Sequence, residues 1–173
     1  MTIVEGMLAE ASVGAATLYH GTTFDGLLSI FTKNILQGFP TDVRIGRKIA
    51  HDGPPSVSFT RDKKVALSHA GKDQNAGKGK AILVFDRERL VRHFGRKLQP
   101  VDVLQIRGHS PDNPFTGFSE AEERVVGNVD HVLDYLTDVL IIDQPAFERF
   151  KQNALANDPN LEDAFALIGK YLA

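Results

Sequence analysis

The chain has 173 residues, of which 42% are hydrophobic and 24% are charged, and its formal net charge at pH 7 is -2. This length fits one domain with its own core, and the composition is that of a soluble globular protein rather than a disordered chain. The net charge gives no overall basic surface for a nucleic-acid backbone, and because cysteine is absent the chain has no disulfide, thiolate nucleophile or sulfur-ligated zinc.

Residues 1–15 are predicted to form a short helix or an arm. They contain Glu5 and Glu10 and lack the positive start and the uninterrupted apolar core of a secretory signal. No apolar run approaches the roughly 20 residues that span a bilayer. We therefore expect a cytoplasmic protein without a membrane partner.

The next part of the chain has the pattern of two strands, each followed by a helix. Residues 17–20 predict a brief strand that ends in a turn at Gly21. Apolar residues recur at helical spacing from residue 24, and a threonine before them can cap this helix, which closes at 36–38. Residues 39–55, rich in glycine, proline and charge, predict a loop. A strand at 56–60 and a helix at 62–69 follow.

A glycine- and lysine-rich segment at residues 71–80 has some features of a phosphate-binding loop. That loop needs four residues between its first glycine and Gly-Lys-Ser/Thr, and it connects a strand to a helix. Here five residues separate Gly71 from Gly77, Gly79 replaces the hydroxyl residue, and the helix comes first. We therefore expect a solvated connection.

The second half of the chain alternates strands and helices again. The clearest strand is the apolar run at 81–85, and a turn-rich loop at 108–119 leads into an acid cluster. The other expected elements are a helix at 87–94, strands at 101–106, 122–126 and 139–142, and helices at 129–136, 145–156 and 161–172. Short strands interleaved with helices predict an α+β fold.

Three short motifs occur at these elements, in the order Tyr19-His20-Gly21-Thr22, Ser56-Val57-Ser58-Phe59 and Glu120-Ala121-Glu122-Glu123. They resemble the active site of the ADP-ribosyltransferases, which cleave NAD at the nicotinamide-ribose bond and pass ADP-ribose to an acceptor. The resemblance implies a split core of two small antiparallel or mixed sheets with flanking helices. Within a single domain of residues 1–173, this core would occupy 16–143 and be followed by C-terminal helices at 144–173.

The first two motifs imply the residues that bind NAD as a co-substrate. In the family, the histidine of the first motif bonds the ribose next to adenine, and the glycine backbone binds the carboxamide of nicotinamide. These positions match His20 and Gly21, with Thr22 completing the turn. Ser56 and Ser58 match a Ser-x-Ser strand, although Ser58 stands where one subgroup has tyrosine. Alone, the first motif is also the pattern of a capped helix after a strand.

The side chain that packs on nicotinamide is left open by this resemblance. A helix follows the second motif and covers nicotinamide in the family. Phe59 and His69 are both candidates, although the composition of protein cores favours a buried core position for Phe59.

The acid cluster leaves two candidates for the catalytic glutamate. In many transferring toxins a Glu-x-Glu pair orients the acceptor with its first acid and stabilises the cationic transition state with its second, which matches Glu120 and Glu122. The apolar residues after the cluster also resemble the end of the poly(ADP-ribose) polymerase pattern, which assigns Glu123 instead. A slip of one residue exchanges the strand faces, so the register stays open, and the complete Glu-x-Glu favours Glu122.

Further expectations concern the loops and metals. Arg44, Arg47 and Lys48 can meet the pyrophosphate of NAD or form a solvated loop. The loop at 108–119 lies where relatives of this class often recognise the acceptor. The histidines lack metal-ligand spacing, so no metal is expected.

The resemblance implies a mono-ADP-ribosyltransferase, a glycosyltransferase-class enzyme, with a protein as the expected acceptor. A toxin-like or phage-like effector would act in the cytoplasm of a host cell. The alternatives are an NAD glycohydrolase, in which water replaces the acceptor, and a non-catalytic NAD-responsive binding domain. A nucleic-acid module built on the basic loops at 44–48 and 72–80 is a further alternative.

Overall fold

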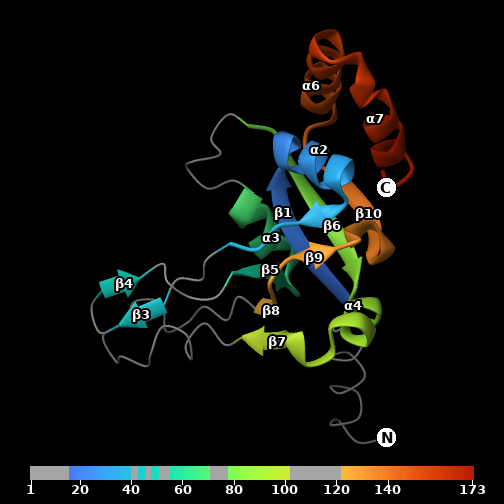
Figure 1. Cartoon of the computed structure of the whole chain (residues 1–173). Helices are drawn as coiled ribbons and strands as arrows, with labels where there is room; N and C mark the ends of the chain where they lie inside the picture. Colours follow the sequence, from blue (N-terminus) through green and yellow to red (C-terminus); the bar gives the residue numbers. More distant parts are fainter. Residues whose placement is uncertain (1–15, 40–42, 46–47, 51–54, 71–77, 102–121) are drawn as a thin grey trace, which may run out of the picture.

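The computed structural model describes residues 16–39, 43–45, 48–50, 55–70, 78–101 and 122–173, whose arrangement is shown in Figure 1. The strands are β1 Thr17–Thr23, β2 Ile35–Leu36, β3 Val43–Ile45, β4 Lys48–Ala50, β5 Ser56–Thr60, β6 Lys80–Asp86, β7 Leu98–Val101, β8 Glu122–Val126, β9 Val129–Asp130 and β10 Leu136–Ile141. The helices are α2 Phe24–Lys33, α3 Lys63–Ala70, α4 Arg87–Phe94, α6 Gln144–Asn157 and α7 Glu162–Gly169, with 3-10 turns η2 Gly95–Lys97, η3 Val132–Asp134 and η4 Pro159–Leu161.

The main sheet is antiparallel and forks between β1 and β5. Its strand order is β10-β6-β1-β5-β8-β7. β1 pairs with β6 from Thr17 to Thr23, but among the described residues it pairs with β5 only at Tyr19↔Thr60. The sheet therefore consists of two three-stranded halves that part beyond Tyr19. This arrangement confirms the expected α+β class with a split core.

Helices α2 and α3 cover opposite faces of β1. The hydroxyl of Thr23 caps α2 by accepting the Gly26 N–H at 3.1 Å, and Asn34 ends the helix in the left-handed conformation. A side chain at position 21 would run into α3, whereas Thr22 lies against α2 at Gly26. Successive strand residues point to opposite faces, so one helix lies on each side of the sheet.

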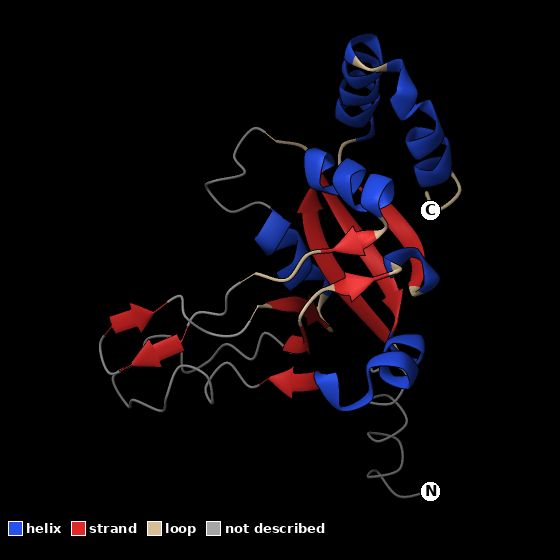
Figure 2. Cartoon of the chain, viewed as in Figure 1, coloured by secondary structure: helices blue, strands red, loops and turns tan. Residues whose placement is uncertain are grey.

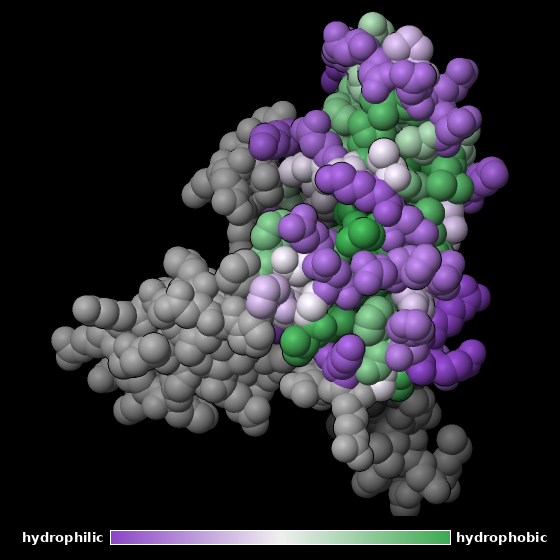
Figure 3. All heavy atoms as spheres, in the orientation of Figure 1, coloured by the Kyte–Doolittle hydropathy of each residue, from purple (hydrophilic) through white to green (hydrophobic). Residues whose placement is uncertain are grey.

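The core lies on the α2 side of the sheet and continues into the C-terminal helices. Phe24 of α2 packs on Phe147 and Phe150 of α6, with ring centroids 5.2 and 5.6 Å apart, and Phe165 of α7 contacts both. Such ring pairs contribute about 1 kcal/mol each beyond area burial, so they hold α6 and α7, drawn as a helical pair in Figure 2, against α2. In Figure 3 hydrophilic side chains cover most of the described surface seen from this side, and hydrophobic ones gather over α6 and α7.

Several expected elements have different bounds. β1 continues through Gly21, which pairs with Ile82 of β6, so the expected turn at Gly21 does not form. The loop expected at 39–55 contains β3 and β4, which pair antiparallel. The strand expected at 101–106 begins earlier, as β7, at Leu98. The expectations for 1–15, 71–77 and 102–121 lie outside the described residues.

The helix expected at 129–136 is wrong. These residues form β9, η3 and the start of β10. His131 takes the left-handed conformation with a φ of 52°, which interrupts a helix. Asn34 then accepts the Val132 N–H with its carbonyl at 3.3 Å and the Leu133 N–H with its side chain at 3.0 Å. Bonds to a residue far away in sequence replace those of the expected helix.

Candidate active site

The imidazole of His20 bridges the two halves of the sheet where they part. Its Nδ1 lies 2.8 Å from the backbone carbonyl oxygen of Ser58. Because a carbonyl only accepts, Nδ1 carries the proton in this bond. The ring thus joins β1 to β5 just beyond the Tyr19↔Thr60 pair.

The same ring is held in its neutral form. Burial lowers the pKa of His20 below its ordinary value of 6.5, the bond to Ser58 opposes this shift, and the positive charge of His69 adds to it. In a neutral ring protonated on Nδ1, the other nitrogen, Nε2, is a hydrogen-bond acceptor. His20 can therefore accept a hydrogen bond from a ligand hydroxyl.

The stability of the protein is expected to fall in mildly acidic solution because of His20. In the unfolded chain this ring takes up a proton near pH 6.5, whereas the buried ring does so only at a lower pH. The folded state binds fewer protons between these two values, so the free energy of unfolding decreases as the pH falls through that window. Thermal unfolding of wild type and His20→Asn from about pH 8 to about pH 5 measures this, since asparagine keeps an N–H for Ser58 and does not titrate. An identical pH dependence in both proteins would contradict it.

The backbone N–H and C=O of Gly21 point into the fork. In β6, the carbonyl of Lys80 accepts the Ile142 N–H and the N–H of Asp86 donates to the Tyr135 carbonyl, at the two ends of β10. The even-numbered residues of β6 therefore make their backbone hydrogen bonds to β10. The odd-numbered residues of β6 make their backbone hydrogen bonds to β1. Their partners in β1 include His20 and Thr22, whose backbone groups therefore point toward β6. Gly21 alternates with these partners and faces the β5 side, where no described strand pairs with it. One donor and one acceptor are therefore presented next to His20.

Gly21 also allows α3 to approach the strand. A Cβ at this position would overlap the backbone carbonyl oxygen of Ala66 and crowd the backbone nitrogen of Ala70. Both atoms belong to helix backbone, which cannot move aside as a side chain can. The close approach of α3 thus requires glycine at position 21.

Gly21→Ala is expected to destabilise the fold by about 2 to 3 kcal/mol, because α3 must shift to admit one methyl group. For a domain of this size the melting temperature should fall by roughly 4 to 10 °C. Thermal unfolding followed by circular dichroism measures this loss. Gly169→Ala is the matched control, because a Cβ at Gly169 meets nothing within 4 Å. Equal melting temperatures of Gly21→Ala and wild type would show that α3 does not restrict the position.

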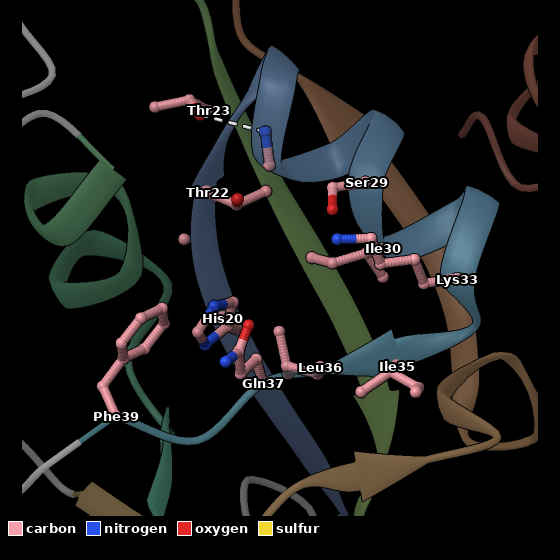
Figure 4. Close-up of a pocket in the computed structure, with 12 residues that line it drawn as sticks. His20, Thr22, Thr23, Ser29, Ile30, Lys33, Ile35, Leu36, Gln37 and Phe39 are labelled. Atoms are coloured by element: carbon pink, nitrogen blue, oxygen red, sulfur yellow. Dashed lines mark hydrogen bonds between the residues drawn. The ribbon is translucent and has the colours of Figure 1, made fainter. Parts of the chain in front are cut away.

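A pocket of about 380 Å³ lies beside His20, in the size range of ligand sites. It is lined by residues 20–23 of β1, by one face of α2 and by the segment that follows α2 (Figure 4). That segment contributes the amide of Gln37 and the ring of Phe39, which is 68% exposed. The pocket thus combines apolar walls with polar groups.

The second motif divides between the two faces of β5. Alternation places Ser56, Ser58 and Thr60 on one face and Phe59 on the other. The ring of Phe59 is 1% exposed and packs edge-on against Phe85, with centroids 5.2 Å apart. Phe59 therefore occupies the core, where its ring supports the sheet.

Glu123 is buried in an ion-pair cluster. Its side chain is 1% exposed. In the register of β5 and β8, Glu123 lies opposite Phe59. Arg87 Nε lies 2.9 and 3.0 Å from its two carboxylate oxygens, and Arg61 Nε lies 3.1 Å from one of them. This cluster ties β8 to the end of β5 and to the start of α4.

Glu122 pairs with Thr60 in the register of β5 and β8. Because successive strand residues alternate, position 122 belongs to the face opposite Glu123, which is the face of Ser58. Glu120 and Arg47 lie outside the described residues, and Arg44 and Lys48 lie in the β3–β4 ribbon.

The structure brings His20, Gly21 and Thr22 together at one pocket, with His69 close enough to affect the pKa of His20. It also places there Ser29, Lys33, Gln37 and Phe39, which sequence reasoning missed. For α2 a signal existed, because Gly26, Ser29 and Lys33 recur at i, i+3 and i+7 and share one helix face. Among the described residues no group of three or more potential metal ligands occurs, and none of the helices in these ranges is long and apolar enough to cross a membrane.

Comparison with known proteins finds similarity in structure rather than in sequence. The sequence matches no protein-family model and no curated protein. Among solved structures, the chain is similar to Thermus sp. 2.9 DarT in complex with carba-NAD+, at 15% identity and a TM-score of 0.48, over 90% of this chain and 91% of that chain. A similarity at this level assigns no residue and no ligand to the present chain.

Proposed function

We propose that the protein is an NAD-dependent mono-ADP-ribosyltransferase, which cleaves the nicotinamide-ribose bond and passes ADP-ribose to an acceptor. The observation that carries the proposal is the fork in the sheet. There a neutral His20 presents an acceptor nitrogen, and the adjoining Gly21 presents a backbone donor and acceptor. These are the groups that the family motif requires at these two positions.

The chemistry asks mainly for positioning. Nicotinamide leaves as a neutral molecule from a cationic ring, so the leaving group needs little acid catalysis. The site must hold the carboxamide, bind ribose hydroxyls and place a carboxylate beside the oxocarbenium-like transition state. A carboxamide has one acceptor oxygen and N–H donors, which complement the backbone groups of Gly21. The Nε2 atom of His20 complements a ribose hydroxyl.

We place the two halves of NAD on either side of the fork. The adenosine half would lie in the pocket between β1 and α2, where His20 and Gln37 are available. The nicotinamide half would pass Gly21 toward the face of Ser58 and α3. His69 of α3 is then the proposed aromatic partner of nicotinamide, because the ring of Phe59 is buried in the core.

We assign the catalytic role to Glu122. Glu123 is a poor candidate because its carboxylate is almost fully buried and accepts hydrogen bonds from Arg87 on both oxygens. Position 122 lies on the face of Ser58, toward which the nicotinamide half is placed. Its carboxylate would bind the 2'-hydroxyl of the nicotinamide ribose and stabilise the developing positive charge. Glu120, two residues earlier, would orient the acceptor.

The test that separates transfer from hydrolysis uses NAD labelled in its adenine ring, incubated with the protein and a cell lysate. Label on macromolecules that is sensitive to protease, together with free nicotinamide, is the expected result for a protein acceptor. Free ADP-ribose with unlabelled macromolecules would instead establish a glycohydrolase. NAD that raises the melting temperature without being cleaved would establish a binding domain.

A further inference from the structure

One face of α2 forms a wall of the pocket and carries a lysine. Gly26, Ser29, Ile30 and Lys33 follow one another at i, i+3, i+4 and i+7, so they share this face. Figure 4 shows the side chain of Lys33 extending from α2 toward β1, with Ser29 on the same side of the helix. A side chain at position 26 would collide with the Thr22 hydroxyl, so glycine keeps this wall open.

The charge of Lys33 is not compensated within the described part of the chain. Lys33 carries the only formal charge among the described residues that line the pocket. None of the ion pairs among the described residues includes Lys33. A lysine in the last turn of a helix, as Lys33 is in α2, also interacts favourably with the helix dipole. That interaction does not require the side chain to lie in a pocket.

The polar groups around Lys33 suit an anion with several oxygen atoms. Ser29 and Thr22 line the same pocket, and each hydroxyl can donate one hydrogen bond. An ammonium group with three donors is a common ligand of phosphate. The described lining residues include no carboxylate that would repel such an anion.

We propose that Lys33 binds a phosphate group of the nucleotide ligand, with the Ser29 and Thr22 hydroxyls as further donors. This inference rests on the proposed function, because it concerns the same pocket. Two phosphates are possible. NAD carries the pyrophosphate that joins its two halves, and a 2'-phosphorylated dinucleotide carries another phosphate on the adenosine ribose, the ribose assigned to His20.

The test measures the affinities of ADP-ribose, adenosine and 2'-phospho-ADP-ribose by calorimetry for wild type and Lys33→Gln. If Lys33 binds the pyrophosphate, Lys33→Gln should weaken the affinity for ADP-ribose about tenfold and leave the affinity for adenosine unchanged. If Lys33 binds the 2'-phosphate, wild type should bind 2'-phospho-ADP-ribose about tenfold more tightly than ADP-ribose. Lys33→Gln should then bind these two compounds with equal affinity. Lys97→Gln is the matched control, since Lys97 is exposed and lies in η2, which does not line the pocket.

Two results would overturn the inference while leaving the proposed function intact. In the first, wild type binds ADP-ribose and Lys33→Gln binds each of the three compounds with the same affinity as wild type does. In the second, Lys33→Gln weakens the binding of adenosine and of ADP-ribose by the same factor. The second result would mean that Lys33 shapes the pocket without contacting phosphate. A folded wild-type protein that binds none of the compounds would contradict the proposed function as well.

Discussion

Glu122→Gln is expected to reduce the rate of nicotinamide release by roughly 100-fold or more, with little change in the affinity for NAD. The amide keeps the shape of the side chain but loses the charge that would stabilise the oxocarbenium-like transition state. Single-turnover rates of nicotinamide release measure the effect, and the melting temperature shows whether the variant is folded. We expect this melting temperature to stay within about 3 °C of wild type.

The Glu123 variant gives this experiment its internal comparison. If Glu122→Gln kept the wild-type rate while a folded Glu123→Gln protein lost it, the catalytic role would belong to Glu123. The nicotinamide half would then have to lie on the other face of the sheet. Wild-type rates in both variants would remove the acid cluster from the mechanism.

Glu123→Gln is expected to destabilise the fold about as much as Gly21→Ala. The neutral amide loses the negative charge between Arg87 and Arg61, whose Nε atoms lie 2.9 to 3.1 Å from the carboxylate, and its NH2 group cannot accept the bond that Arg87 Nε makes to the second oxygen. Removing one partner of a buried ion pair costs about 3 to 5 kcal/mol, but both arginines are partly exposed, so we expect about 2 to 3 kcal/mol. The melting temperature should fall by roughly 4 to 10 °C.

Thermal unfolding of a double-mutant cycle with Arg87→Gln tests this origin. If the ion pair is responsible, the two single losses should not add, because each removes the same interaction. Glu88→Gln is a suitable control, since Glu88 is exposed and should change stability by no more than about 0.5 kcal/mol. A Glu123→Gln protein as stable as wild type would show that the buried carboxylate contributes nothing to the fold.

Helices and strands whose two ends are marked by capping or turn residues could be predicted from the sequence. α4 occupies the predicted residues 87–94 because Asp86 caps its start and Gly95 follows its end. β8 likewise has its predicted bounds. The helix prediction for residues 129–136 was wrong because the backbone of this segment donates hydrogen bonds to Asn34, which is distant in sequence. No local pattern reveals such a partner.

The candidate site was predictable only where it is contiguous in sequence. His20 and Gly21 adjoin one another, so a short motif identifies them. The register that separates Glu122 from Glu123 depends on pairing with β5, and the arginine that holds Glu123 lies 36 residues away. The position of Lys33 in the pocket could not be predicted, because a lysine near the C-terminal end of a helix is common and indicates no binding site. The sequence therefore identified candidate residues, whereas the face of the strand on which each one lies could be assigned only from the fold.

The most direct test of the account is release of nicotinamide from NAD by the purified wild-type protein, followed by chromatography with and without a lysate as acceptor source. We expect nicotinamide formation that increases with enzyme concentration and time and is lost in Glu122→Gln. A folded wild-type protein that binds NAD and releases no nicotinamide under either condition would contradict it.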